Sequence, residues 1–322
     1  MIQSFDAFVT AALFDRSGRA AFALGDGTIR FEDGAAVEAH DGAALAACLH
    51  PSGEGILSGG DDGRLVWAKP EGATELAKVP GAWLDSVAAS AESKLIAFAA
   101  GRELHVRDAA DPSFSRLFRH ERTVAGVAFD PKGRRIAAAT YGGACLWFAR
   151  IAEQRPTVLK WAGSHVTVVW SPDGRFLISG MQENALHGWR VADEKNMRMG
   201  GYPAKVKGLA FVAKGNALLT SGANGLVVWP FSGSSGPMGK QAAEVGPEEK
   251  ALVTCVAGAP ALGWAAWGLD DGRVRACDLA GQRMVEVKAE PGAAISVIAM
   301  TADGRRVAWG DEDGGAGVFD IA

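Results

Sequence analysis

The sequence lacks the short motifs that most directly reveal an enzyme. It has no G-x-S-x-G nucleophile elbow, no G-x-x-x-x-G-K-S/T phosphate loop and no G-x-G-x-x-G fingerprint. Its six histidines are scattered, and no two have the spacing of metal ligands on a helix. The acidic run DEDGG at 311–315 lacks the closing glutamate of a calcium loop. These absences predict a protein that is not an enzyme and that needs no cofactor or metal.

A strong excess of charge is also missing. The net charge is −4 and no basic run occurs, which disfavours nucleic acid as a partner. The first residues carry no positive charge ahead of their apolar stretch, so we expect no signal peptide. The uncharged segment Ala251–Leu269 is long enough to cross a bilayer, but Pro260 interrupts it and small residues dilute it. We expect two buried strands there, over 252–257 and 263–268, and no contact with a membrane.

Cysteine is scarce and unclustered. The four residues are Cys48, Cys145, Cys255 and Cys277, and none forms a C-x-x-C pair. Free, buried thiols fit a reducing compartment, so we expect a cytoplasmic protein. Cys255 and Cys277 are expected on the first and third strands of one sheet, too far apart for a disulfide.

What the sequence does contain is a repeat. An apolar run ends just before a turn such as DPKG, SPDG, HPSG or DRSG, and a second apolar run follows the turn. The last residue of the first run recurs about every 40 residues, which is the period of four-stranded propeller blades. These anchors lie near residues 14, 49, 90, 129, 170, 211, 258 and 300.

Each unit contains three predicted strands. The second and third strands are often joined by an Asp-Gly or Asn-Gly turn, which favours a tight hairpin. The third strand ends in an aromatic residue in most units, as at Trp67 and Trp147. Segments between units, such as 73–79 and 155–161, are expected to supply a fourth, outer strand.

This pattern resembles the WD40 repeat over almost the whole chain. In that family a histidine, a serine, an aspartate and a tryptophan form one hydrogen-bonded network, and the matching residues here are His40, Ser58, Asp62 and Trp67. The closing Trp-Asp dipeptide is absent, so the repeat is degenerate. The resemblance implies that these four residues have a structural role.

The resemblance implies an all-β fold, a closed β-propeller of WD40 type. The eight anchors predict eight four-stranded blades within a single domain, 1–322. Closing the ring requires either a short N-terminal strand around 1–4 or a last blade of three strands. The Gly/Ser-rich insertion at 230–241 is expected to be a flexible loop.

Several exposed side chains are expected on one face, where the loops before each first strand meet the second hairpins. Phe5, Trp161 and Tyr202 occupy the place of the family's histidine, and we expect them to pack inward. Acids are expected on other loops of this face, at Asp61, Asp270, Asp311 and Glu312. The residues interpreted as partner-binding are aromatic, basic or methionine, types enriched in interfaces: Phe8, Trp83, Arg122, Tyr141, Met181 and Lys205.

The family resemblance implies a non-catalytic scaffold or adaptor that binds another protein or peptide on this face. We expect a monomer. The alternative is a protein that binds a small ligand or a metal in its central channel. An acidic sector beside an aromatic sector would suit a basic or mixed peptide.

Overall fold

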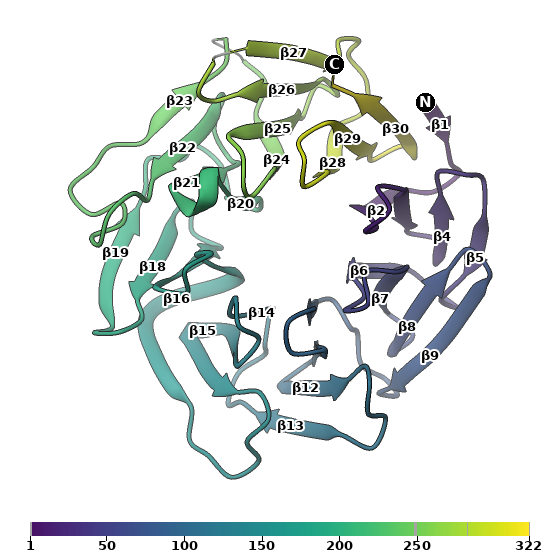
Figure 1. Ribbon diagram of the computed structural model, residues 1–322, viewed down its shortest axis with the longest axis vertical. Coiled ribbons are helices and arrows are strands. Elements are labelled where there is room, and N and C mark those ends of the chain that lie inside the picture. Colours follow the sequence, from purple (N-terminus) through teal and green to yellow (C-terminus); the bar gives the residue numbers. More distant parts are fainter. Residues whose placement is uncertain (1, 248–249, 282, 322) are drawn as a thin grey trace.

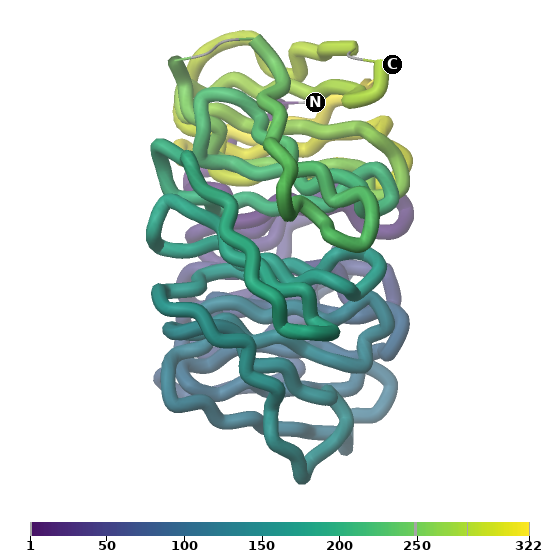
Figure 2. The backbone as a smooth tube through the Cα atoms, turned by 90° about the vertical axis from the view of Figure 1, so that its left-hand side faces the viewer, coloured from purple at the N-terminus to yellow at the C-terminus, as the bar shows by residue number. Residues whose placement is uncertain are grey.

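Among the residues that the structure describes, thirty strands form radial sheets around a central opening (Figure 1). The computed structural model describes residues 2–247, 250–281 and 283–321; Met1, part of the predicted N-terminal strand, lies outside them. Seen from the side, the strands run across a disc and the turns gather on its two opposite faces (Figure 2). One 3-10 helix, η1 (Ala213–Gly215), occurs among the described residues.

Six of the sheets have four strands each. They are β2 (Val9–Phe14), β3 (Ala20–Leu24), β4 (Thr28–Phe31) and β5 (Ala36–Glu38); β6 (Ala44–Leu49), β7 (Ile56–Gly60), β8 (Arg64–Lys69) and β9 (Gly72–Lys78); β10 (Val87–Ser90), β11 (Leu95–Ala100), β12 (Glu103–Asp108) and β13 (Ser115–Arg119); β20 (Leu209–Val212), β21 (Ala217–Thr220), β22 (Leu226–Pro230) and β23 (Ala243–Val245); β24 (Val253–Gly258), β25 (Trp264–Leu269), β26 (Val274–Asp278) and β27 (Arg283–Lys288); and β28 (Ile295–Met300), β29 (Arg306–Asp311) and β30 (Gly315–Asp320) with β1 (Ile2–Ser4).

The remaining sheet has six strands. It contains β14 (Gly126–Phe129), β15 (Arg135–Phe148), β16 (Thr157–Trp170), β17 (Phe176–Met181), β18 (Leu186–Arg190) and β19 (Lys195–Met199). The prediction of eight four-stranded blades is therefore wrong, because hydrogen bonding joins the strands into seven sheets. Counted by these sheets, the propeller has seven blades.

The reason lies in β16, which joins the repeat units anchored at 129 and 170. Its first half pairs with β15 and its second half with β17. The segment TVLKWAGSHVTVVW contains no proline and no Asp-Gly turn, so nothing ends the strand between the two units. The corresponding connection into β10, VPGAWLD, carries both Pro80 and Gly81 and breaks the chain there.

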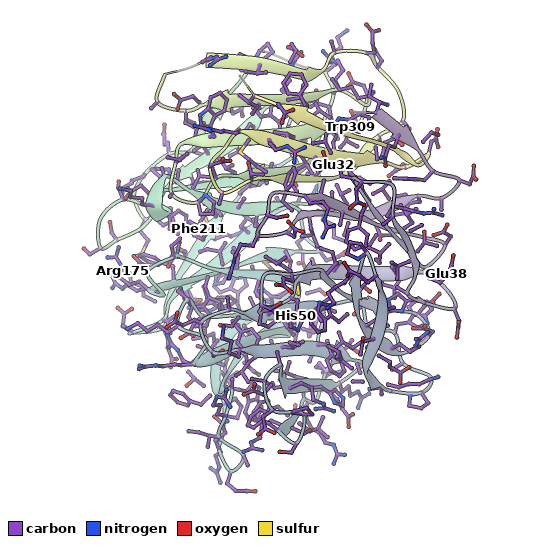
Figure 3. The ribbon with its side chains drawn as sticks, turned by 45° about the vertical axis from the view of Figure 1, so that its right-hand side comes forward. Glu32, Glu38, His50, Arg175, Phe211 and Trp309 are labelled. Carbon is purple, nitrogen blue, oxygen red and sulfur yellow. The ribbon has the colours of Figure 1, made fainter. Side chains whose placement is uncertain are left out.

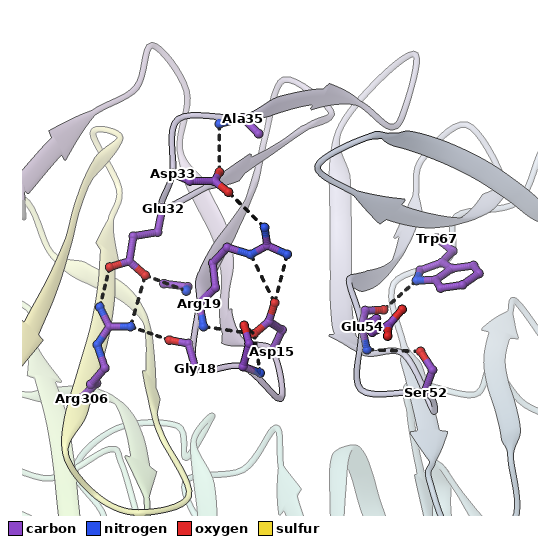
Figure 4. A network of polar contacts seen from close by, with 12 residues as sticks. Asp15, Gly18, Arg19, Glu32, Asp33, Ala35, Ser52, Glu54, Trp67 and Arg306 are labelled. Carbon is purple, nitrogen blue, oxygen red and sulfur yellow. Dashed lines mark hydrogen bonds and ion pairs between the residues drawn. The ribbon is translucent and has the colours of Figure 1, made fainter.

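The ring is closed by a strand from each end of the chain. β1 pairs antiparallel with β30, opposite Gly315–Gly317, so of the two alternatives the N-terminal closing strand is the one that forms. Arg306 of the last sheet contacts the carboxylate of Glu32 in the first (Figure 4). Burial alone would raise the pKa of Glu32, but the hydrogen bond from Arg306 holds that pKa below its usual value. Sheet pairing and a partly buried ion pair thus hold the same seam.

The apolar core lies in layers between neighbouring units rather than at the centre of the ring. Phe211 and Trp309, labelled in Figure 3, belong to two of these layers. Another layer, which includes Leu159 and Trp189, packs the two halves of the six-stranded sheet against each other. Strands covered on both faces need no strict alternation, which explains the uniformly apolar second strands such as β11.

The Asp-Gly hairpins hold neighbouring sheets in register. Gly27 and Gly63 have φ of +85° and +75°, values that a side chain would strain. A Cβ on Gly27 would lie 2.5 Å from His40 O, and one on Gly63 would lie 2.2 Å from Val79 O. Each glycine therefore lies directly beneath the loop that leads to the next sheet.

The segment 251–269 forms β24 and β25, which confirms the two predicted strands. The described residues contain no helix with the length and apolar character needed to cross a membrane. All four cysteines are free thiols, and burial raises the pKa of Cys48, Cys255 and Cys277 to about 12.

Three of the four residues assigned to the structural network lie together. His40 Nε2 is 2.8 Å from Ser58 Oγ, and His40 Nδ1 is 3.1 Å from Asp62 Oδ1. Asp62 also accepts hydrogen bonds from the N–H groups of Asp41 and Arg64. Burial lowers the pKa of His40, and the contact with Asp62 only partly offsets this effect. The network ties β7 and its hairpin to the loop that enters β6.

Trp67 lies outside that network, contrary to the sequence interpretation. Its indole N–H donates to Glu54 O, 2.8 Å away in the turn after β6 (Figure 4). Its ring stacks on His50 with the centroids 4.0 Å apart, and Lys69 lies over it. The hydrogen bond of the indole N–H is therefore made to the turn and not to Ser58. Trp147, in contrast, donates to His120 Nε2 at 3.0 Å.

The insertion at 230–241 is docked, not flexible as the composition predicted. Phe231 is buried, and Gly236 and Pro237 are buried with it. A Cβ on Gly236 would lie 2.9 Å from the Phe176 ring, so only glycine allows this close approach. The segment therefore covers the apolar layer between β17 and β21.

We predict that His40→Ala lowers the free energy of unfolding by about 1–3 kcal/mol, because Ser58 and Asp62 lose a partner in a buried site. Thermal or urea unfolding measures the effect. Asp41→Ala, a change of an exposed side chain in the same loop, is the control and should be nearly neutral. Equal unfolding midpoints for His40→Ala and the wild type would contradict the prediction.

Deleting 232–237 should destabilise the protein, because it uncovers Phe176 and Phe231. Exposing large apolar side chains costs about 1.5–3 kcal/mol each at full exposure, so we expect a loss of about 2–4 kcal/mol. The measurement is chemical unfolding, with Ser234→Ala as the control at an exposed position of the loop. A deletion variant as stable as the wild type would show that the docked segment contributes nothing.

Candidate loop-face binding site

The candidate site is the loop face, defined as the loops that lead into the inner strands together with the hairpins between second and third strands. Hydrogen bonds join the two sets of loops. Leu84 N–H, ahead of β10, donates to Gly60 O at the β7–β8 hairpin over 3.0 Å. Asp41 N–H, ahead of β6, donates to Asp62 Oδ2 over 3.1 Å. The two sets therefore meet on one face of the disc.

Trp83 is the most exposed aromatic side chain on this face. Its side chain is 67% exposed, whereas its neighbour Leu84 is fully buried. Leu84 packs in the apolar layer between β7 and β11, so the preceding residue of the extended loop points toward solvent. The loop itself is fixed by the hydrogen bond to Gly60. Trp83 thus extends from a backbone that is already held in place.

Arg122 is held in the same way on the loop before β14. His120 N–H donates to Arg102 O at 2.9 Å, and Val124 N–H donates to Gly101 O at 2.8 Å. Val124 is buried, whereas Arg122 is exposed. No ion pair to its guanidinium occurs among the described residues, so its charge is available to a ligand.

Tyr141 lies at the bend of β15 and is 62% exposed. Gly142 follows it with φ of +93°, and Tyr141 pairs opposite Ser164 of β16. Trp161, on the same strand β16, stacks on His187 with the ring centroids 3.9 Å apart, yet it remains 37% exposed. The expectation that Trp161 packs inward is therefore only half correct.

The other residues predicted to bind a partner differ in how far they are exposed. Phe8 is 41% exposed, and Lys205 is half-buried. Met181 is only 4% exposed, so its assignment as a partner-binding residue was wrong. A Cβ on Gly163 would lie 2.4 Å from Met181 Cε, which places the methionine side chain beneath the neighbouring strand.

Tyr202 takes the place of the histidine in its unit, as predicted. Its hydroxyl lies 2.6 Å from Thr220 Oγ1 and accepts a hydrogen bond from Trp229 Nε1 over 2.7 Å. Burial raises the pKa of Tyr202, so the phenol stays neutral and can donate. Phe5 packs on Phe22 with the ring centroids 6.0 Å apart.

The predicted acidic sector is smaller than the sequence suggested. Asp61, Asp270 and Glu312 are exposed. Asp311 is buried, because its carboxylate accepts hydrogen bonds from Asp313 N–H and Gly315 N–H at 3.1 and 2.6 Å. It shapes the β29–β30 hairpin and is not available to a partner.

The central channel holds a cavity of about 1060 Å³. Inner strands contribute apolar side chains to its wall, among them Leu13, Leu49 and Met300. The turns 15–18 and 301–303 also line it, which places its mouth at the end of the strands opposite the loop face. In the part of the chain that the structure describes, no group of three or more His, Cys, Asp or Glu side chains could hold a metal.

Comparison with known proteins identifies the repeat and the fold. Residues 34–67 match the family model "WD domain, G-beta repeat". No curated protein sequence matches the chain.

Three solved structures are similar in fold. The computationally designed Ika8 protein has a TM-score of 0.79 at 17% identity, covering 99% of this chain and 98% of that one. The Myceliophteria thermophila Cps50 (Swd1) β-propeller domain has a TM-score of 0.68 at 15% identity, covering 87% and 96%. A chain of the Mitotic Checkpoint Complex has a TM-score of 0.67 at 15% identity, covering 100% and 91%. At these identities the likeness concerns the fold alone.

The family match therefore covers one repeat, and it includes Ser58 and Asp62 of the hydrogen-bonded network. The radial sheets and the closed seam extend the same architecture around the ring. On this combination of repeat and architecture, the protein is a β-propeller of the WD40 type.

Proposed function

We propose that the protein is a non-catalytic scaffold that binds another protein or peptide on its loop face. Propellers of the WD40 type generally act as protein-interaction scaffolds, and the similar structures include a chain of a multiprotein complex. The observation that carries the proposal is the exposure of Trp83 and Tyr141 next to buried residues, Leu84 and Thr140.

The binding surface would centre on the loops of the third and fourth repeat units. Large aromatic side chains lose little conformational freedom when they bind, and they dominate the energy of many interfaces. Trp83 and Tyr141 are of this type, and Arg122 adds a charge without an intramolecular ion pair among the described residues. Large exposed apolar patches on a protein commonly mark a site of interaction.

The partner would be a mixed peptide segment with an apolar and a basic part. The apolar part would cover Trp83 and Tyr141, while Asp61, Asp270 and Glu312 would attract the basic part from other loops of the same face. The proposal includes a monomeric protein of the reducing cytoplasm, supported by the four free thiols.

A second candidate function follows from the cavity in the channel. Its volume of about 1060 Å³, its apolar inner wall and the charged residues that also line it, such as Arg16 and Arg305, favour a small ligand with an apolar and a charged part. The dye anilinonaphthalene sulfonate should then fluoresce with the wild type, and Ala257→Phe should weaken the signal by filling the cavity. Ala162→Phe, an exposed change on β16, is the control. If both variants give the same dye fluorescence, the dye binds outside the channel cavity and this second candidate function is wrong.

For the scaffold, we predict that Trp83→Ala combined with Arg122→Ala abolishes partner binding while the thermal midpoint stays unchanged. Truncating a hot-spot residue costs about 2 kcal/mol or more in binding, so the two changes together remove a micromolar interaction. A partner is first captured from the native host and identified, and its affinity for each variant is then measured by calorimetry.

Leu262→Ala combined with Arg305→Ala is the matched control. It also removes one exposed apolar side chain and one exposed arginine, but from turns at the other end of the strands. This control should bind as the wild type does. If the control variant loses the partner and the Trp83/Arg122 variant keeps it, the loop face is not the binding surface.

A further inference from the structure

The outer edge of the fourth repeat unit is formed by the first half of β16, residues 157–161. These residues pair with β15 on one side only, through contacts such as Cys145↔Val158 and Gly143↔Lys160. No strand among the described residues pairs with their other edge. Two carbonyls at the end of this segment are occupied, because Trp189 Nε1 donates to Lys160 O over 3.5 Å and His165 Nε2 lies 3.1 Å from Trp161 O. Along the rest of the edge, the outward N–H and C=O groups are available to pair with another chain.

Outer strands elsewhere in the ring are protected against such pairing. Three of them, β1, β5 and β23, have only three residues each. The other four carry two or more charged side chains: β9 has Glu75 and Lys78, β13 has Arg116 and Arg119, β19 has Lys195 and Arg198, and β27 has Arg283, Glu286 and Lys288. Short length and charge are the usual means of blocking edge pairing. The segment TVLKW at 157–161 is longer than three residues and has a single charge.

Apolar side chains are exposed along this same edge. Val158 is 43% exposed and Trp161 is 37% exposed. Phe148 and Ile151, which lead from β15 into the connection to β16, are 51% and 48% exposed. That connection projects from the rim of the ring at the bottom of Figure 1. An added strand would therefore gain side-chain contacts as well as backbone hydrogen bonds.

Charge around the edge identifies the occupant. In the connection and the edge, residues 149–161, the basic residues Arg150, Arg155 and Lys160 outnumber the single acid, Glu153, and Arg150 is paired with Asp108. Arg155 and Lys160 are exposed at the edge itself, and neither has an ion pair among the described residues. A second copy of the chain would bring the same positive charges against this edge, and like charges across a strand pair are unfavourable.

We propose that the outer edge of β16 is a strand-addition site for an extended, acidic segment of a protein partner. The segment alternates apolar and acidic residues, so that it pairs with the backbone of 157–161 and places carboxylates near Arg155 and Lys160. This surface lies on the outer wall of the ring, apart from Trp83 and Arg122 on the loop face.

The experiment uses the full chain and a fluorescein-labelled peptide of about eight residues that alternates glutamate and valine. Fluorescence anisotropy measures its binding, and hydrogen exchange maps the protected amides. We expect binding with slower exchange at 157–161. A lysine–valine peptide of equal length should bind at least tenfold more weakly, and a glutamate–valine peptide with N-methylated backbone should not bind.

Lys160→Glu should weaken the binding of the glutamate–valine peptide by about fivefold, because it replaces an attraction by a repulsion at an exposed site. Lys195→Glu is the matched control, since Lys195 is an exposed lysine on the outer strand β19. Equal losses for the two variants, or protection that maps away from 157–161, would overturn the proposal.

Two further outcomes separate the alternatives. A dimer in ultracentrifugation whose interface protects 157–161 would assign the edge to a second copy and refute the acidic partner. The Trp83→Ala and Arg122→Ala double variant should bind the peptide like the wild type. The edge site and the loop-face scaffold can therefore fail independently.

Discussion

Closure of the ring is the constraint on which the rest of the structure depends. Each apolar layer needs a sheet on both sides, so a ring left open would expose two sheet faces and the edges of their strands. The seam joins residues from the two ends of the chain, β1 with β30 and Glu32 with Arg306. Bringing such distant segments together has an entropic cost, which grows only slowly with loop length. A three-residue strand and one ion pair can therefore complete a ring whose other layers already hold their positions.

The same constraint decides which side chains reach solvent on the loop face. Every loop that enters a new sheet must cross a hairpin of the sheet before it, and glycines such as Gly63 let the two backbones approach. Buried residues, for example Leu84 and Val124, then anchor each loop in an apolar layer. Their neighbours on the extended loop are left outside. The exposure of Trp83 is thus a consequence of packing that also gives it a fixed position for binding.

Local signals made most of the fold predictable from the sequence. Turn residues and a period of about 40 residues identified the strands, and the uncharged segment 251–269 was correctly interpreted as β24 and β25. The number of sheets was wrong because β16 lacks a turn between two units, and counting repeats cannot detect hydrogen bonds that continue across their boundary. The contacts of individual side chains were predicted correctly in some cases and wrongly in others. His40 meets Ser58 and Asp62, but Trp67 turned to Glu54 and Met181 lies beneath Gly163. These partners are close in the chain, in the turn before β7 and on the adjacent strand β16, but the repeat pattern does not specify which of several near neighbours a side chain contacts.

The continuity of β16 also links the architecture to a second surface. In most units the outer strand ends at a turn before the next inner strand begins, so the outer strand can be short or charged without disturbing its neighbour. In β16 a single strand is both the outer strand of the fourth repeat unit and the inner strand of the fifth. Its apolar β-forming residues therefore extend out to the rim. The inner half, which includes His165 and Trp170, is buried by packing, whereas the outer half keeps the same character with an unpaired edge. The missing turn that merges two repeat units into one sheet therefore also leaves the least protected edge of the propeller at this place, beside the positive charges of Arg155 and Lys160.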